Sequence, residues 1–403
     1  MHGSPLLRSV IMPLMYLGLL RAAVVAAAAG CSSDEDCSLG GECHAGRCAC
    51  YPTWRGPNCT ILNLLPAHAS NTTSRLPAAW ARPGEQSSWG GRPVVNETTG
   101  RWHLYAADMT RKCGLHAWTE NSAISHASAD AAAGPYALVE AQVQGVFSHN
   151  PTAHRAPDGT FLIYHIGSGT PRTTTPPFNC SNGTTPTRGG RPRAVAEASS
   201  PAARPLPRVG DTMSPNILAA SRAAGPWEIY MQGNGCTNPA PFFFDNGTVL
   251  LMCSLRNNES HFGVAVAPSW SGPYRWKAIT QIFGEDAFIW RQPADGSFHM
   301  LFHTTVYPVR GICTTAWSRD GLHWTPAFAT TANTTVAQAY PSFGMEFRLD
   351  VGGSFVASRR ERHQLVMDSA GWPSLLLNGA AAPSFGRDFT FTSAQPINTE
   401  REP

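Results

Sequence analysis

A pattern that recurs five times along the chain constrains its fold more than any other feature of the sequence. Each copy has a polar residue, then Pro or a small residue, an apolar stretch, a turn centred on Gly and a second apolar stretch. The polar residue precedes the Gly by 8, 9, 9, 10 and 9 residues in the pairs Arg92/Gly100, Asn150/Gly159, Asn238/Gly247, Asp286/Gly296 and Arg362/Gly371. Asp-Gly and Asn-Gly between apolar stretches are strong signals for a β-hairpin. The sequence therefore predicts five hairpins in near-constant register.

Four of these hairpins are followed by a third segment that ends on Gly and an aromatic residue: Tyr136, Trp227, Tyr274 and Trp324. Repeats of about 50 residues with several strands each are typical of propeller blades. The 37 Gly and 33 Pro residues suit short strands joined by tight turns. We expect an all-β fold with a five-bladed β-propeller over residues 89–395. The alternative is a β-sandwich whose hairpins match by coincidence.

Two segments differ in composition from the repeats. Residues 61–88 contain Pro, Ser and Asn, and we interpret them as a linker. Residues 170–208 are rich in Pro, Thr, Arg and Ser, and we expect them to form a long inserted loop of the second blade.

The first 29 residues predict export. Arg8 is followed by an apolar stretch, and Ala27 and Ala29 form the small-residue end of a cleavable signal peptide, so the mature chain would begin near Gly30. One alternative is an uncleaved signal anchor in a membrane, which Arg21 would make costly by about 2.5–3.5 kcal/mol at the bilayer centre. Another is a bacterial lipoprotein box, which would consume Cys31.

Glycosylation sequons and cysteines agree with an oxidising compartment. Eleven cysteines are present, and seven Asn-x-Ser/Thr triplets begin at Asn71, Asn96, Asn179, Asn182, Asn246, Asn258 and Asn333. We expect a secreted glycoprotein. The net charge of +3 and the lack of a basic stripe give no nucleic-acid footprint.

Six cysteines are crowded into a short stretch that we assign to a small domain, residues 30–60. The stretch from Cys48 through Gly56 to Cys59 resembles the C-terminal half of an EGF-like module. The resemblance implies the pairs Cys31–Cys43, Cys37–Cys48 and Cys50–Cys59, whereas spacing alone leaves fifteen connectivities open. A zinc site is the alternative. Calcium-binding members carry acidic residues before the first cysteine, which are missing here, so we expect no calcium; the module would serve protein contacts.

The propeller repeats resemble glycoside hydrolase family 43 and its relatives in families 32, 62 and 117. The phrases that carry the resemblance are 158–164 (DGTFLIY), 223–227 (AAGPW) and 318–324 (SRDGLHW). The resemblance implies a sugar site in a central funnel where the inner strands begin. It also implies an Asp, an Asp and a Glu on blades one to three. The matching positions here are Arg92, Asn150 and Asn238, so the family's carboxylates cannot be carried over.

Other carboxylates lie at the same point of the fourth and fifth repeats. Glu285, Asp286 and Glu361 are therefore our candidate catalytic residues, since glycoside hydrolysis usually needs an acid and a second carboxylate. We expect the carboxyl groups of Asp286 and Glu361 to lie about 5–10 Å apart. Because arginines flank Glu361, we expect it to be ionised and Asp286 to be the better acid. The alternative is that Glu361 only pairs with its flanking arginines and that Asp286 caps a turn.

The remaining candidates would bind the substrate. Arg92 and Arg362 suit an anionic sugar, because a guanidinium grips a carboxylate or sulfate with two hydrogen bonds. His149, Asn150 and Asn238 would line the funnel mouth, and Trp89 and Trp290 would stack on sugar rings unless they fill space between blades. His149, His165 and His303 lack metal-ligand spacing, and no cofactor motif occurs, so we expect neither metal nor cofactor.

Five cysteines lie in the propeller. Cys236 and Cys253 flank one hairpin and form our best candidate bridge, while the pairing of Cys113, Cys180 and Cys313 stays open and an odd number leaves one unpaired. The sequence thus favours a secreted carbohydrate-active protein that hydrolyses O-glycosidic bonds. The alternative is a non-catalytic glycan-binding or extracellular matrix protein on the same scaffold.

Overall fold

Short β-strands make up nearly all of the regular structure. The computed structural model describes residues 30–70, 75–83, 86–170, 177–181, 206–233, 235–255, 261–305, 312–327, 341–382, 384 and 388–400. The helical segments among them are η1 (Leu115–Ala117) and α1 (Trp118–Asn121). The predicted leader, residues 1–29, and the sequons at Asn71, Asn182, Asn258 and Asn333 lie outside the described residues.

The N-terminal module consists of two small hairpins held by disulfides. Its strands are β1 (Gly41–His44), β2 (Arg47–Cys50), β3 (Trp54–Arg55) and β4 (Ile61–Leu62). Strand β1 pairs with β2, and β3 pairs with β4. The bridges are Cys31–Cys43, Cys37–Cys48 and Cys50–Cys59, the connectivity that the EGF-like resemblance implies.

Two four-stranded antiparallel sheets follow, each built from consecutive strands. The strands of the first are β6 (Ser88–Val95), β7 (Trp102–Met109), β8 (Ser122–Ala129) and β9 (Ala137–Gln144). The strands of the second are β10 (His149–Arg155), β11 (Phe161–Ile166), β13 (Asn216–Ala220) and β14 (Glu228–Met231).

The next sheet has eight strands because one long strand belongs to two ladders. Strand β18 (Tyr274–Arg291) pairs with β17 as far as Phe283 and with β19 from Gly284 onward. The other strands are β12 (Thr212–Met213), β15 (Thr237–Phe243), β16 (Val249–Ser254), β17 (His261–Ala267), β19 (Phe298–Thr304), β20 (Cys313–Ser318) and β21 (Thr325–Pro326). The count of five blades depends on dividing β18 at this change of partner, and it stays a prediction.

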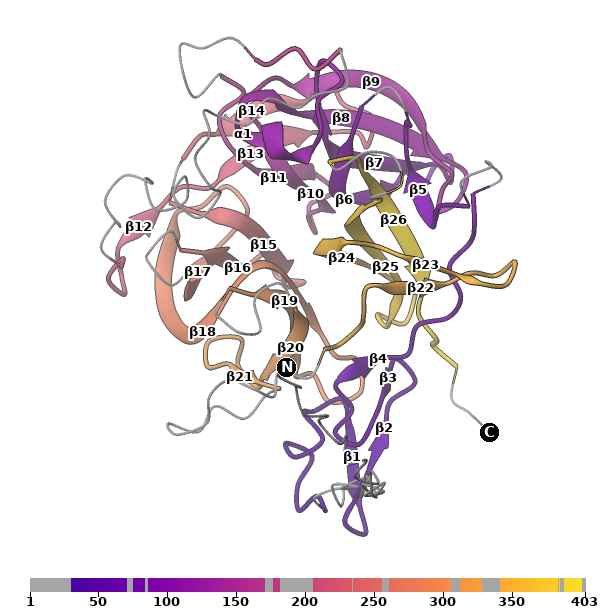
Figure 1. The fold of residues 1–403 in the computed structure, drawn as a ribbon. Helices are drawn as coiled ribbons and strands as arrows, with labels where there is room; N and C mark the ends of the chain where they lie inside the picture. Colours follow the sequence, from indigo (N-terminus) through magenta and orange to yellow (C-terminus); the bar gives the residue numbers. More distant parts are fainter. Residues whose placement is uncertain are drawn as a thin grey trace, which may run out of the picture.

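The last sheet contains a strand from before the first sheet. It consists of β24 (Arg359–Met367), β25 (Pro373–Ala381), β26 (Thr390–Pro396) and β5 (Ala78–Trp80). A separate hairpin, β22 (Glu346–Arg348) with β23 (Ser354–Val356), precedes β24. Figure 1 shows the sheets arranged around a common centre, with the small module below them. Strand β5 joins the two ends of this arrangement, as expected of a closed propeller.

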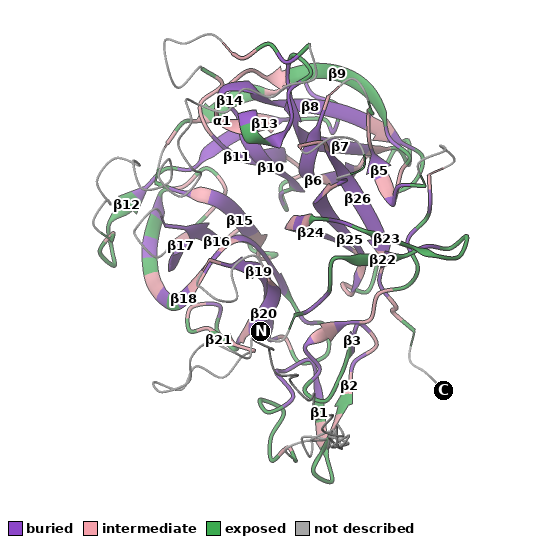
Figure 2. Ribbon diagram, viewed as in Figure 1, coloured by how far each residue is buried: buried purple, intermediate pink, exposed green. Residues whose placement is uncertain are grey.

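Residues 61–88 are therefore more than a linker. Ala67 and Leu76 are buried in a cluster with Phe347 and Phe391, and β5 completes the last sheet. All five predicted hairpins are present, and each turn Gly has a positive φ, between 70° and 90°. Figure 2 shows the inner strands buried, whereas the outer strand β9 is largely exposed.

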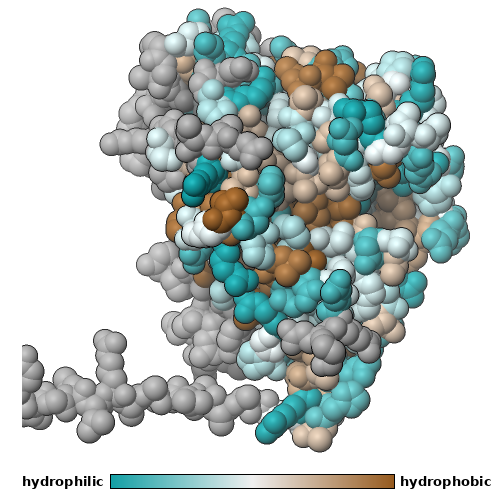
Figure 3. Space-filling view, turned by 90° about the vertical axis from the view of Figure 1, so that its right-hand side faces the viewer, coloured by the Kyte–Doolittle hydropathy of each residue, from teal (hydrophilic) through white to brown (hydrophobic). Residues whose placement is uncertain are grey.

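The surface mixes polar and apolar residues. Figure 3 shows separate hydrophobic patches within a largely hydrophilic face. Exposed apolar residues include Leu138 and Val139 on β9 and Val351 and Val356 at the β22–β23 hairpin. In the described part of the chain, neither helical segment has the length or hydrophobicity that crossing a membrane requires.

Candidate functional site

The five inner strands are β6, β10, β15, the part of β18 that pairs with β19, and β24. Each contains a register shift near the start of its pairing with the next strand, and these shifts define equivalent positions. They lie between Trp89 and Arg92 in β6, and in the other inner strands at His149/Thr152, Thr237/Ala240, Glu285/Phe288 and Glu361/Gln364. The second residue of each shift has a positive φ: Gly90 60°, Asn150 49°, Asn238 49°, Asp286 59° and Arg362 54°. Such bulges re-aim side chains next to functional sites. Four of the five predicted equivalent residues are confirmed.

The fifth, Arg92, is wrong by two residues, since Gly90 occupies the equivalent position. Arg92 donates hydrogen bonds from Nε to the carbonyl of Leu365 (3.0 Å) and from Nη1 to the carbonyl of Ala153 (2.7 Å). Its guanidinium lies 5.7 Å from the ring centroid of Phe288. Burial lowers its pKa to about 10. Arg92 thus connects the inner strands β6, β10, β18 and β24.

The side chain of Arg362 passes over Gly90, which has no side chain to obstruct it. A Cβ at Gly90 would lie 2.4 Å from Cγ of Arg362. The Nη2 of Arg362 donates to the carbonyl of Asn150 (2.6 Å), and Nη1 lies 3.8 Å from Oδ1 of Asp286. Asn150 in turn donates from Nδ2 to Oδ1 of Asn238 (2.8 Å) and to Oδ1 of Asp286 (3.2 Å). The side chains of the four polar residues at the equivalent positions, Asn150, Asn238, Asp286 and Arg362, therefore converge.

Three further ionisable groups, Glu285, His303 and Glu361, lie around Asp286. Nδ1 of His303 lies 3.3 Å from Oδ2 of Asp286, and its Nε2 lies 3.2 Å from Oε1 of Glu285. Asp286, His303 and Glu361 each offer an atom within 4.8 Å of the others. The side chains of Asp286 and His303 are nearly buried, whereas those of Glu361 and Glu285 are 17% and 38% exposed. The cluster therefore reaches solvent through its two glutamates.

The environments of the two carboxylates push their pKa values apart. Burial raises the pKa of Asp286, but the hydrogen bond and charge of His303, together with Arg362, outweigh it and lower that pKa to about 2. Burial also raises the pKa of Glu361, and here the nearby His303 and Arg359 do not cancel the effect. These directions are the reverse of the expectation that Glu361 is the ionised partner and Asp286 the better acid. His303, which the sequence analysis considered only as a metal ligand, lowers the pKa of Asp286 through its hydrogen bond and charge and so accounts for the reversal.

The carboxyl groups of Asp286 and Glu361 approach each other closely, because an oxygen of each lies within 4.8 Å of the other. These oxygens and a nitrogen of His303 are also atoms that could coordinate a cation. Sequence spacing did not reveal this grouping. The buried guanidinium of Arg362, 3.8 Å from Asp286, adds a fixed positive charge beside them. That charge opposes a divalent cation.

Neither of the two predicted stacking tryptophans presents a free face. Trp89 is 3% exposed, and its ring lies against Gly379, where a Cβ would approach it to 2.4 Å. Trp290 is 2% exposed and stacks on Trp54 of the small module, with centroids 6.0 Å apart. Both fill space between elements, the alternative that the sequence left open.

An aromatic side chain that the sequence analysis missed lies beside His149. Trp118 in α1 is half-buried, and its ring centroid is 4.9 Å from that of His149. Nδ1 of His149 is 2.7 Å from Oγ of Ser122, and burial lowers its pKa to about 3. The neutral imidazole is thus held in one orientation, next to Asn150 in the chain. Only the position of Trp118, shortly before β8, could have suggested it from sequence.

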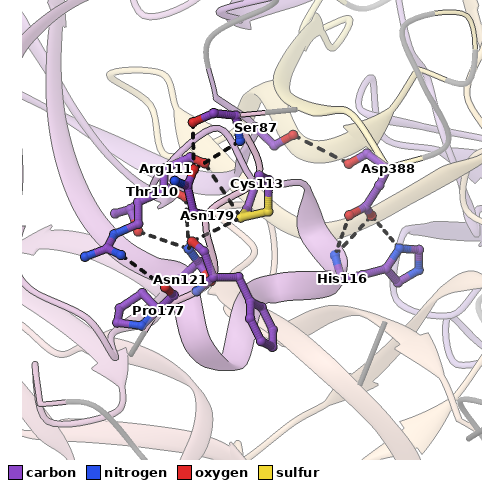
Figure 4. The surroundings of a disulfide bond; sticks show 12 residues. Ser87, Thr110, Arg111, Cys113, His116, Asn121, Pro177, Asn179 and Asp388 are labelled. Carbon is purple, nitrogen blue, oxygen red and sulfur yellow. Dashed lines mark hydrogen bonds and ion pairs between the residues drawn. A yellow bond between two sulfur atoms is a disulfide. The ribbon is translucent and has the colours of Figure 1, made fainter. Parts of the chain in front are cut away.

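Two further disulfides hold the propeller. Cys236–Cys253 is the predicted hairpin bridge, and Cys113–Cys180 connects the inserted segment to the loop before η1 (Figure 4). Cys313 is unpaired and buried, with Sγ 3.3 Å from Nε2 of His363. The bridges and the EGF-like module indicate an extracellular protein.

Comparisons with known proteins agree with this two-part architecture. The family model of the Teneurin-like EGF domain matches residues 33–62. Among curated proteins, none is similar to this chain in sequence.

The propeller is similar to solved glycoside hydrolases. The catalytic domain of a GH62 α-L-arabinofuranosidase from Coprinopsis cinerea superposes with a TM-score of 0.50 at 11% identity, covering 83% of this chain and 95% of that one. An α-L-arabinofuranosidase from Podospora anserina in complex with cellotriose gives 0.49 at 10% identity, with coverages of 86% and 98%. A family 117 glycoside hydrolase from the marine bacterium Zobellia galactanivorans gives 0.48 at 12%, with coverages of 85% and 91%. At these identities the likeness shows the fold alone, that of the β-propeller glycosidases.

Proposed function

We propose that this protein is an exported carbohydrate-active enzyme that hydrolyses O-glycosidic bonds at the centre of the propeller. The observation that carries the proposal is the pairing of Asp286 and Glu361. They come from β18 and β24, an oxygen of each lies within 4.8 Å of the other, and their pKa values are shifted in opposite directions. Two carboxyl groups with pKa values pushed apart supply the acid and the base that glycoside hydrolysis needs.

The short separation supports a double displacement that retains the configuration of the sugar, because retaining enzymes hold their carboxyl groups about 5–5.5 Å apart. In the first step an oxygen of Asp286 bonds to the anomeric carbon. The leaving oxygen takes the electron pair of the broken bond and the proton of Glu361. In the second step the ionised Glu361 removes a proton from water, whose oxygen displaces Asp286. Each group then returns to its starting state.

Neighbouring groups keep the two carboxyls in these roles. The Nδ2 of Asn150 donates to Oδ1 of Asp286, and His303 lies between Asp286 and Glu285. Both contacts favour the ionised form of Asp286. Glu285 is the most exposed of the three acidic side chains, so it is placed to contact the substrate and to hold the position of His303.

The arginines favour a neutral sugar over an anionic one. Arg92 uses its guanidinium on two backbone carbonyls, and Arg362 is fully buried against Asn150 and Asp286. Arg359, which is 24% exposed, lies 3.1 Å from Glu361. Arg362 keeps two nitrogens without a hydrogen-bond partner, but its burial keeps them from a carboxylate or sulfate in solution. His149, Asn150 and Asn238 offer hydrogen bonds suited to hydroxyl groups.

Export and glycosylation belong to the same proposal. The leader and the sequons motivate it, and the five disulfides and the EGF-like module support it. Among the predicted glycosylation sites that the structure describes, Asn179 and Asn246 are exposed and Asn96 is half-buried.

A second function is favoured by the ion pairs of the same carboxylates. Glu361 has Arg359 at 3.1 Å, and Asp286 has His303 at 3.3 Å, so each carboxylate already has a cationic neighbour. A scaffold that keeps these pairs when it binds sugar would be a non-catalytic glycan-binding or matrix protein.

A two-stage experiment tests the proposal. A glycan array probed with the Glu361→Gln variant identifies ligands, because loss of the acid leaves binding groups in place. The wild-type protein is then incubated with each ligand, and released reducing sugar is measured. We expect cleavage of ligands that the variant binds. Binding without any release would support the non-catalytic function, and absence of binding would overturn both.

A further inference from the structure

The bridge Cys113–Cys180 fixes a five-residue segment, 177–181, onto the loop before η1 (Figure 4). Backbone N of Cys180 donates to the carbonyl of Arg111 (3.1 Å), and Nη1 of Arg111 donates to the carbonyl of Pro177 (3.2 Å). The amide of Asn121 bonds both backbone groups of Phe178, at 3.0 and 2.9 Å. The segment is thus tied on both sides of Asn179.

The same bridge lies inside a glycosylation sequon. Asn179, Cys180 and Ser181 form the triplet Asn-x-Ser, so the middle residue of the sequon is the bridged cysteine. Asn179 is exposed, but its Oδ1 accepts hydrogen bonds from the backbone N (3.1 Å) and the Oγ (2.6 Å) of Ser181. Once the bridge has closed, the sequon is therefore held in one compact turn.

Glycan transfer needs the opposite state of this segment. The Nδ2 of Asn179 forms a bond to the anomeric carbon of a lipid-linked oligosaccharide, the lipid diphosphate leaves with the bonding electrons, and the amide loses one proton. The transferring enzyme must surround the triplet, including the hydroxyl of its third residue. A segment fixed on both flanks by a disulfide and hydrogen bonds gives no such access.

We propose that glycan attachment at Asn179 competes in time with closure of the Cys113–Cys180 bridge. Cys113 precedes Cys180 by 67 residues, so its thiol is already present when the chain delivers Asn179 and Cys180 together. Early closure leaves Asn179 unmodified, whereas late closure allows both the glycan and the bridge. The exported protein is therefore a mixture at Asn179. This inference rests on the export part of the proposed function and is independent of catalysis.

Two other described sequons lack this coupling and serve as internal references. Asn246 belongs to the turn between β15 and β16, and Asn96 to the turn after β6; neither triplet contains a cysteine. Both lie at hairpin turns, where we expect glycan attachment to be insensitive to the bridge.

The test measures site occupancy by mass spectrometry of glycopeptides from cell-associated and secreted protein together, so that a variant retained in the cell is still counted. All chains carry Asn182→Gln, which removes the neighbouring sequon. Cys113→Ser prevents the bridge without altering the triplet. The matched control is Cys236→Ser, which removes a bridge of the β15–β16 hairpin that does not involve the segment 177–181.

We expect Cys113→Ser to raise the occupancy of Asn179 several-fold and to leave that of Asn246 unchanged. An equal rise in Cys236→Ser would mean that general misfolding exposes the sequon, and it would overturn the inference. An unchanged occupancy of Asn179 beside a glycosylated Asn246 would overturn it while export stands. A chain without glycan at any sequon would contradict the inference and the export proposal together.

Discussion

Trp54 of the EGF-like module stacks on Trp290 of strand β18, with ring centroids 6.0 Å apart and ring planes 20° apart. Both are nearly fully buried, and the ring of His299 lies within 5.5 Å of each. Module residues and propeller residues share one hydrophobic cluster there. The module is therefore part of the propeller's core rather than a mobile spacer.

Trp54→Ala should destabilise the whole molecule by about 3–5 kcal/mol, the usual cost of truncating a buried Trp. Calorimetry should show one unfolding transition at a lower temperature, because the module and the propeller unfold together. Tyr230→Ala, at a residue that is 46% exposed, is the control and should change little. Two separate transitions, with that of the propeller unshifted, would contradict the account.

Gly90→Ala tests the path of Arg362 across the site. The added Cβ would lie 2.4 Å from Cγ of Arg362. Gly100→Ala is the matched control, because Gly100 also has a positive φ (70°) but no atom within 4 Å of its Cβ position. Both variants strain the backbone, and we expect Gly90→Ala to cost about 1–3 kcal/mol more in urea unfolding. Equal losses would show that Arg362 does not take this path.

Buried histidines should make the protein sensitive to acid. Burial lowers the pKa of His149 and His363 to about 3 and of His165 and His299 to about 4. The unfolded chain, with pKa values near 6.5, then binds more protons than the folded one. Stability is complete above about pH 6.5 and falls below it by about 1.4 kcal/mol per pH unit and per histidine.

Urea unfolding at several pH values checks this slope. His165→Gln should reduce the slope of the unfolding free energy against pH by the contribution of one proton. His303, whose pKa is raised by Asp286 and Glu285 against the effect of burial, acts in the other direction, since its contribution is lost as pH rises through its folded pKa. A stability that is constant between about pH 7 and pH 5 would refute the prediction.

Arg92→Ala should reduce stability without changing the preference among sugars. The substitution removes two hydrogen bonds of a charged group, each contributing about 1.5–3 kcal/mol, and leaves the carbonyls of Leu365 and Ala153 without these donors. Thermal unfolding and an array of acidic and neutral glycans measure the two effects. A selective loss of acidic glycans would instead place Arg92 in the binding site.

The sequence predicted those features of the site that depend on residues close together in the chain, and it missed those that depend on distant residues. The hairpins and the positions of Asn150, Asn238, Asp286 and Arg362 follow from local turn signals. In the first repeat the sequence predicted Arg92 at the equivalent position, because it is the polar residue there. The bulge in fact places Gly90 at this position, and a residue without a side chain gives no signal in the sequence pattern. Trp290 was predicted to stack on a sugar ring, because the sequence does not show that Trp54, more than 200 residues away in the chain, covers it. The acid and base roles were reversed because His303 comes from the paired strand.

The central claim is that Glu361 is the acid of a hydrolytic site. The most direct measurement is kcat for release of reducing sugar from an array-selected ligand, by wild-type protein, Glu361→Gln and the exposed control Glu346→Gln, between about pH 4 and pH 8. We predict that Glu361→Gln lowers kcat by about 10²–10⁴ with binding retained, and that Glu346→Gln has no effect. Because the pKa of Glu361 is raised and that of Asp286 is about 2, wild-type activity should be highest at acidic pH and should fall as pH rises through the pKa of Glu361. Equal kcat in Glu361→Gln and wild type, or no release by any of the three proteins, would contradict the account.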